Sequence, residues 1–150
     1  MIGVTLKKQL NTFDTIKSIL KTSTILKTKF KDKDYYEFEP SLKSLKQTDI
    51  PYIVIPLPET ETEEVVMNHS SRLKNFNIII TLVVDYMARD KYKTFANAII
   101  DTLESNKATL EKNGYYDLMI DFIGANDELI DNLKVISGQF ELSLTGNIVR

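Results

Sequence analysis

Three aspartates are the residues of this sequence best suited to metal-assisted chemistry. Asp85, Asp117 and Asp121 fall in segments where apolar and polar residues alternate, on the less apolar face of adjacent predicted strands. Clustered carboxylates can hold Mg²⁺ for phosphoryl chemistry, as in a metal-dependent nuclease. Such a site usually has a lysine or glutamate at the same strand end, and the sequence places none there. We therefore expect these aspartates to keep an open sheet face soluble.

The single histidine gives little scope for other catalysis. His69 lies near Glu63 and Glu64 in the sequence, but a metal site would need more fixed donors than these. No cysteine is present, which excludes disulfides and thiolate zinc sites. The sequence also has no GxxxxGK(S/T), GxGxxG or GxSxG motif. We therefore expect a protein without catalytic residues, bound metal or cofactor.

Charged residues divide the chain into a basic part and an acidic part. Residues 1–48 hold ten lysines and five acids, whereas residues 49–150 hold nine basic and sixteen acidic residues. Two surfaces of opposite sign favour head-to-tail self-association or a charged partner. Lysines outnumber arginines sixteen to three. Since bidentate phosphate clamps prefer arginine, base-specific DNA recognition is not indicated.

Two segments concentrate these charges and are the candidate contact surfaces. Residues 58–71 lack a regular period and predict a long acidic loop, a feature that in compact domains is either functional or mobile. Its candidate partner-binding residues are Glu59, Glu61, Glu63, Glu64, Val65, Val66 and Met67. The candidate basic subunit-contact surface consists of Lys27, Lys29, Lys31 and Lys33. The alternative for both segments is a solvated face without a partner.

The elements that position these segments are organised around residues 75–106. Apolar residues at even positions from Phe76 to Tyr86 share one face of a predicted strand over residues 75–86. Apolar residues at three- and four-residue spacing then predict an amphipathic helix over residues 90–106. Asp90 is the expected N-cap of this helix, and Asn113-Gly114 is a strong stop signal.

Similar patterns predict the other elements. An apolar stripe indicates a helix over residues 4–21, and the polar, basic residues 22–34 are typical of a loop or a weak edge strand. Short strands are predicted at residues 35–39 and at 52–55, where Pro51 and Pro56 bracket the apolar run. Alternation predicts strands over residues 115–124 and 134–147, joined by an acidic connection over 125–132. Gly138 and Gly146 fall on the apolar face of the last strand, where they permit bending or close packing.

These elements indicate one α+β domain spanning residues 1–150. Strands that are apolar on one face predict a two-layer sandwich, in which a mostly antiparallel or mixed sheet carries helices on one face. A chain of 150 residues that is 43% hydrophobic and 27% charged is typical of a single globular domain. No apolar run approaches ~20 residues, so no membrane-spanning segment is expected.

The order of elements resembles that of the tail terminator (tail completion) proteins of long-tailed bacteriophages. The matching parts are the N-terminal helix, the proline-bracketed strand, the long loop at residues 58–71 and the strand–helix–strand–strand unit at residues 75–148. Arg72, just before the central strand, also fits this pattern. The resemblance covers most of the chain and contains no diagnostic motif, and the basic segment at residues 22–34 is longer than in the family.

The resemblance implies a structural virion protein of the tail or neck, assembled in the host cytoplasm and without enzymatic activity. It would form a homohexameric ring that caps the tail tube, ends tube polymerisation and joins the tail to a head–tail connector or neck protein. DNA would pass through without specific binding, and no membrane contact is implied. The acidic residues 59–64 would either line the channel, where they repel DNA, or meet a basic tube surface and order on binding. We favour the tube contact.

Three other functions are compatible with the sequence. They are another phage ring component such as a head-closure or tail tube protein, a small dimeric regulatory domain, and the metal-dependent nuclease. Solution mass separates a ring from a dimer, and Mg²⁺-dependent cleavage of DNA would identify the nuclease.

Overall fold

Three long antiparallel strands form the body of the sheet. They are β4 (Ser71–Asp85), β6 (Leu133–Val149) and β5 (Tyr115–Ile130), which lie side by side in this order. The structure is a computed structural model that describes residues 12–38, 40, 50–66, 71–130 and 133–149. The three strands predicted from alternation are confirmed. β4 begins four residues before its predicted start and ends one residue before its predicted end, β5 continues six residues further, and β6 is longer at both ends.

Three shorter strands complete the sheet on the other side of β4. β2 (Tyr52–Val54) pairs antiparallel with one half of β4, and β1 (Tyr35–Tyr36) pairs parallel with β2. β3 (Glu59–Val66) pairs antiparallel with the other half of β4. The described strands therefore form a six-stranded mixed sheet in which β2 and β3 share one edge of β4.

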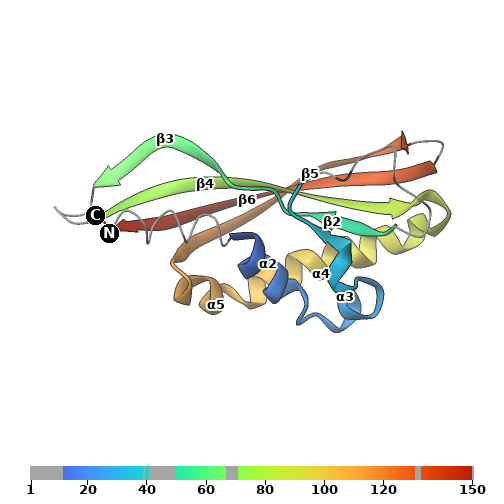
Figure 1. Cartoon of the computed structure of the whole chain (residues 1–150), viewed down its shortest axis with the longest axis horizontal. Coiled ribbons are helices and arrows are strands. Elements are labelled where there is room, and N and C mark those ends of the chain that lie inside the picture. The colour runs from blue at the N-terminus through green and yellow to red at the C-terminus, as the bar shows by residue number, and fades with distance from the viewer. Residues whose placement is uncertain (1–11, 39, 41–49, 67–70, 131–132, 150) are drawn as a thin grey trace.

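The helices cover one face of this sheet, as Figure 1 shows. They are α2 (Thr12–Leu20), α3 (Thr24–Lys29), the 3₁₀ segments η1 (Asp32–Asp34) and η4 (Tyr86–Lys91), α4 (Tyr92–Ser105) and α5 (Lys107–Lys112). The α+β two-layer sandwich is thereby confirmed. Among the described residues, no helix has both the length and the apolar character needed to span a membrane.

The main core lies between the helices and the even-numbered face of β4. Phe76, Ile78, Ile80, Leu82 and Val84 are all buried, as the alternation of β4 predicted. They pack in one cluster with apolar residues of the helices and of β6, among them Ile16, Leu26, Phe95, Ile99, Leu103, Phe140 and Leu142. Burial of this many aliphatic and aromatic side chains is the main favourable free-energy term for the fold.

The opposite face of the sheet differs between its two ends. Where β2 pairs with β4, a second small core buries Tyr52, Val54, Val83 and Val135, so the expected largely polar outer face is apolar here. Further along, the face is polar. Ser143 Oγ donates to Asn77 Oδ1 at 3.2 Å, and Thr145 Oγ1 donates to Asn75 Oδ1 at 3.1 Å.

The N-terminal third is more helical than its composition indicated. The predicted helix at residues 4–21 is confirmed from Thr12 to Leu20, and its earlier residues lie outside the described part of the chain. Residues 22–34 were expected to form a loop or weak edge strand, and this prediction is wrong. Ser23 Oγ accepts a hydrogen bond from the Leu26 amide at 3.3 Å and caps α3, while Leu26 and Phe30 bury themselves against the core.

Two predicted connections are strands instead. Residues 59–66 form β3 because Thr60, Thr62 and the two valines fit an extended ladder, although a polar strand has no hydrophobic period to reveal it. The acidic residues 125–130 continue β5, because β6 supplies a partner for each of them from Gly138 to Leu133. β5 also contains two irregularities in its pairing, near Asp117 with φ of 56° and near Gly124 with φ of 156°.

The start of the central helix was also mispredicted. Asp90 does not cap it, because the 3₁₀ segment η4 precedes α4 and Lys91 occupies the N-cap position. Asp85 is the capping residue at this corner, since its Oδ1 accepts from the Met87 amide at 3.0 Å. The strand therefore passes into helix through a capped 3₁₀ turn rather than directly.

Substitution of Gly138 should destabilise the fold. A Cβ at this position would overlap the phenol of Tyr92, which packs directly over the strand. We expect Gly138→Ala to cost about 1–3 kcal/mol through overpacking, measured by urea denaturation. Because the Tyr92 hydroxyl has no hydrogen-bond partner among the described residues, adding Tyr92→Phe should recover part of the loss. An unchanged stability in Gly138→Ala would show that Tyr92 does not pack there.

Candidate contact surfaces

The three aspartates considered for metal binding do not converge. They were expected on adjacent strands, but β6 lies between β4 and β5. Asp85 lies opposite Val135, and Asp121 lies opposite Glu141, six residues further along β6. Within the part of the chain that the structure describes, no group of three or more histidine, aspartate or glutamate side chains is arranged to hold a metal ion. The geometry offers no support for the nuclease alternative.

The candidate lysines lie on α3 and around η1. Lys27 and Lys29 occupy the last turn of α3, Lys31 precedes η1 and Lys33 lies within it, and all four are exposed. None of the four forms an ion pair with a described carboxylate. Exposed lysines without a described ion-pair partner favour contact with an acidic partner.

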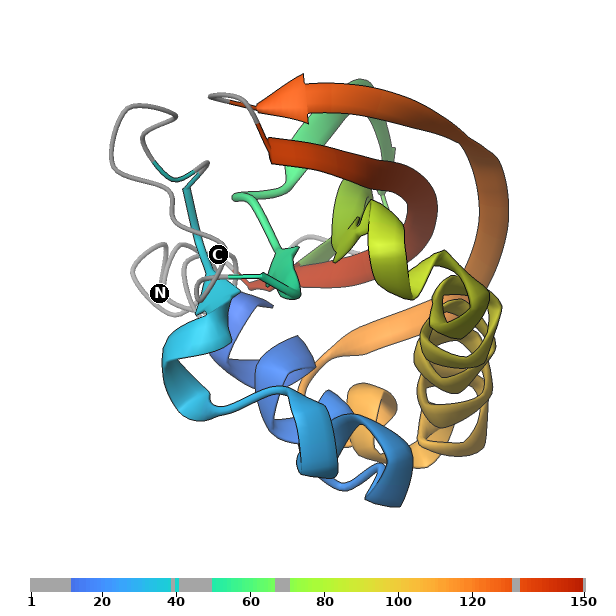
Figure 2. The ribbon, with the colours of Figure 1, turned by 90° about the vertical axis from the view of Figure 1, so that its right-hand side faces the viewer.

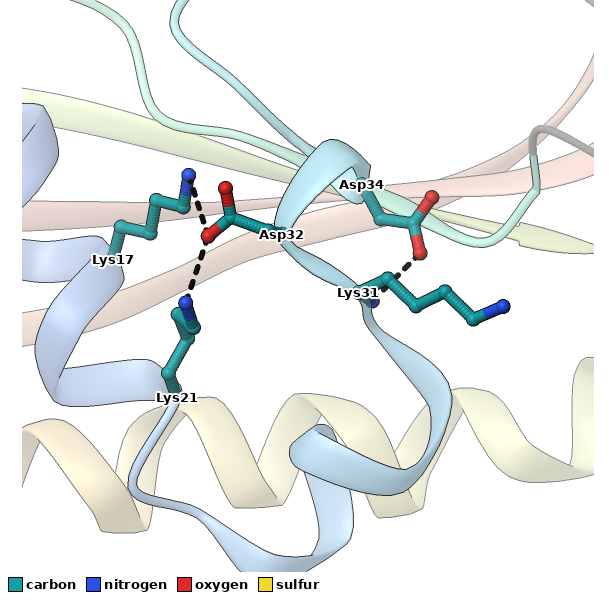
Figure 3. A network of polar contacts seen from close by, with 5 residues as sticks. All are labelled: Lys17, Lys21, Lys31, Asp32 and Asp34. Carbon is teal, nitrogen blue, oxygen red and sulfur yellow. Dashed lines mark hydrogen bonds and ion pairs between the residues drawn. The ribbon is translucent and has the colours of Figure 1, made fainter.

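A polar network holds this basic surface in place (Figure 3). Asp32 Oδ1 accepts from Lys21 Nζ at 2.7 Å and pairs with Lys17 Nζ at 3.1 Å. These two lysines of the N-terminal segment hold the pKa of Asp32 below its usual range. The Lys31 amide donates to Asp34 Oδ2 at 2.8 Å and closes the turn. The acids of η1 are thus occupied locally, which leaves the side chains of Lys31 and Lys33 directed outward.

Residues 59–66 of the acidic segment form an edge strand rather than a loop. β3 pairs with β4 from Glu59 opposite Asn77 to Val66 opposite Arg72, with one irregularity between Thr60 and Glu64. Among the described strands β3 pairs only with β4, so its second edge is open. Met67 and His69 lie outside the described residues.

A groove that the sequence did not reveal lies between α4 and the hairpin formed by β5 and β6. On the hairpin it is bordered by the middle and second half of β5 and the first half of β6. It encloses about 630 Å³ and is lined on the helix side by Tyr92, Ala96 and Ile100. Phe122, Ala125, Ile136 and Phe140 line the hairpin side. Figure 2, which views the molecule from this end, shows the hairpin curving over the end of the molecule above α4. We call this feature the α4–hairpin groove.

The rim of the α4–hairpin groove is basic on the helix side. Arg89 and Lys93 border it, and neither forms an ion pair with a described carboxylate. The Arg89 guanidinium lies 4.6 Å from the centre of the Tyr86 ring. Lys134 Nζ, from β6, lies 3.9 Å from the centre of the same ring. Asp127 is the acidic residue on the hairpin side. Burial raises the pKa of Tyr92 to about 12, so its hydroxyl stays neutral at the groove floor.

Exposed apolar residues gather around the same end of the molecule. Met87 on η4 is 80% exposed, and on β5 the exposed fractions are 53% for Phe122, 52% for Ile123 and 75% for Leu129. Phe122 lines the α4–hairpin groove, whereas Met87 lines a separate pocket with Ile50 and Leu133. Exposed apolar side chains beside a groove mark an interaction surface. The sequence concealed this surface, because the pairing irregularity near Gly124 breaks the alternation from which facing was inferred.

The fold recurs in a virus-like particle. No known protein family matches this sequence, and no curated protein matches it. A chain in a solved structure of the virion of a native gene transfer agent (GTA) particle superimposes with a TM-score of 0.55. The match has 13% sequence identity and covers 90% of this chain and 95% of that chain. This likeness extends over almost the whole of both chains and establishes a shared fold.

Proposed function

We propose that this protein is a structural, non-enzymatic component of a virion, located in the tail or neck. The observation that carries the proposal is the almost full-length fold likeness to a chain of a gene transfer agent virion. A small domain with two charged surfaces and no converging catalytic residues among those described also suits a building block of an assembly. The host cytoplasm is the expected place of assembly.

Within the virion, we assign it the role of tail terminator. A hexameric ring would cap the tail tube, stop its polymerisation and offer the joining surface for a head–tail connector. Its partners would be copies of itself, the tail tube protein and the connector or neck protein, and DNA would pass through the ring without specific binding. The support for this role is the element order described above, together with a charge distribution that favours head-to-tail contacts.

The charged surfaces favour contacts between different ends of two subunits. In Figure 1, β3 lies toward the left-hand end of the molecule, whereas α3 lies in the right-hand half and the start of α4 at the right-hand end. β3 and α3 therefore lie in different parts of the same subunit. Contact between unlike ends is heterologous, and heterologous contacts generate rings when the rotation between subunits closes.

Particles assembled without this protein provide the test. We expect tubes that polymerise beyond their normal length and carry no heads, with normal tails restored when the protein is supplied separately. Tail lengths in electron micrographs are the measurement. Tails of normal length that lack heads would instead assign a head-closure role, and normal, infectious particles would contradict a role in the virion. A Lys107→Glu, Lys112→Glu variant, altered on α5 away from both candidate surfaces, should restore tails like the unaltered chain.

A further inference from the structure

The α4–hairpin groove has the character of a docking site for an extended segment. Its walls are largely apolar, its helix side carries Arg89 and Lys93 without described ion-pair partners, and Phe122 on its hairpin side is 53% exposed. An occupant must therefore bring apolar side chains to cover the floor and carboxylates to meet the rim. An apolar site with a basic rim selects such a segment by charge as well as by burial.

One described segment of this same chain has that composition. β3 has the sequence ETETEEVV, in which four glutamates precede two adjoining valines. It is an edge strand with one open side among the described strands. Open strand edges are usually covered by another element or chain, because their unpaired amides and carbonyls favour further pairing. β3 is therefore available for contact with a second chain.

The two features cannot meet within one molecule. Figure 1 shows β3 toward one end of the long axis, and the end of β5, the start of β6 and the start of α4 at the other end. A contact between them must therefore join two copies. In a pair of copies joined this way, one copy still has an unoccupied groove and the other an unbound β3. Further copies can therefore add in the same way until the ring closes.

We propose that β3 of one subunit docks in the α4–hairpin groove of the next copy. The valines cover the apolar floor, and the glutamates face Arg89 and Lys93 at the rim. The proposal rests on the self-assembly proposed above and names the surfaces that carry it. It also replaces the tail tube by the neighbouring subunit as the partner of the acidic segment, since the groove of this chain offers the apolar floor and basic rim that the segment fits.

Charge exchange tests which surfaces meet. Reversing the charge of the groove rim with Arg89→Glu and Lys93→Glu should weaken self-association at least about tenfold, because the net charge at the contact changes by four units. Adding Glu63→Lys and Glu64→Lys in the same chain should restore it to within about threefold, because attraction returns with opposite sign. Sedimentation velocity at low salt measures both effects, with Lys107→Glu, Lys112→Glu as the matched control.

A disulfide trap tests the same contact independently of charge. The chain has no cysteine, so Thr62→Cys on β3 and Asn97→Cys at the groove introduce the only two thiols. We expect oxidation of the double variant to give a ladder of covalent oligomers whose peptides link position 62 to position 97. Each single variant should give no species larger than a dimer. This readout holds even if the rim-reversed variant fails to fold.

The outcomes separate this inference from the proposed function. An unaltered chain that assembles, combined with a rim reversal without effect or an absent 62–97 link, would overturn the docking of β3 in the groove and leave the ring standing. If Glu63→Lys and Glu64→Lys instead restore the self-association of a Lys27→Glu, Lys29→Glu variant, β3 contacts α3 of the next copy and not the groove. An unaltered chain that never assembles would contradict the ring itself.

Discussion

Replacing Leu82 by alanine should lower the free energy of unfolding by about 2–5 kcal/mol, the range for removing a fully buried leucine. Leu82 has no exposed surface and lies at the centre of the sheet, opposite Ile53 of β2 and Gly138 of β6. Because Gly138 has no side chain and Tyr92 already packs over it, little material is available to refill the cavity. The site therefore belongs near the upper part of the range.

Chemical denaturation of Leu82→Ala beside a neighbouring control provides the measurement. Thr81 faces the opposite side of the sheet and is half-buried, so Thr81→Ala should cost less than about 1 kcal/mol. A difference between the two variants confirms that the even-numbered face of β4 is the core. A cost for Leu82→Ala well under ~1 kcal/mol would contradict that assignment.

Reversal of the α3 and η1 lysines should disrupt assembly. We expect Lys27→Glu, Lys29→Glu, Lys31→Glu and Lys33→Glu together to weaken self-association at least about tenfold, since the N-terminal third of one subunit would then repel the acidic remainder of the next. The unaltered protein should itself associate less as salt rises, because exposed charges are screened. Light scattering across a salt series measures both, with the α5 reversal as control. Equal association of all variants would exclude a charge-led contact.

The sequence predicted elements wherever one face of a strand or helix is apolar. The alternation from Phe76 to Val84 predicted β4 and its buried face, and the helical spacing of Phe95, Ile99 and Leu103 predicted α4. The same reasoning failed for β3, because a strand of glutamates and threonines at a sheet edge has no apolar face. It failed again for α3, a helix of six residues that depends on the Ser23 cap and on burial of Leu26.

The candidate contact surfaces, like the fold, were predicted from the sequence only in part. The sequence identified the charged segments, since charge is read directly from residue types, and the structure locates their ordered residues at separated places in the fold. The α4–hairpin groove was invisible in the sequence because it is made by tertiary contact between α4 and the hairpin, whose residues lie 22 or more positions apart along the chain, Ile100 and Phe122 being the nearest pair. The pairing irregularities of β5, which orient Phe122 and Ile123, are set by backbone geometry rather than by a pattern of residue types.

The mass of the purified protein in solution, measured by light scattering at low salt and high concentration, tests the central claim most directly. A hexameric ring predicts a particle of about six times the mass of the single chain, with no populated dimer, because head-to-tail contacts close only when the ring is complete. A stable dimer would support a regulatory domain instead. A monomer under these conditions, also after addition of polymerised tail tubes, would contradict the ring.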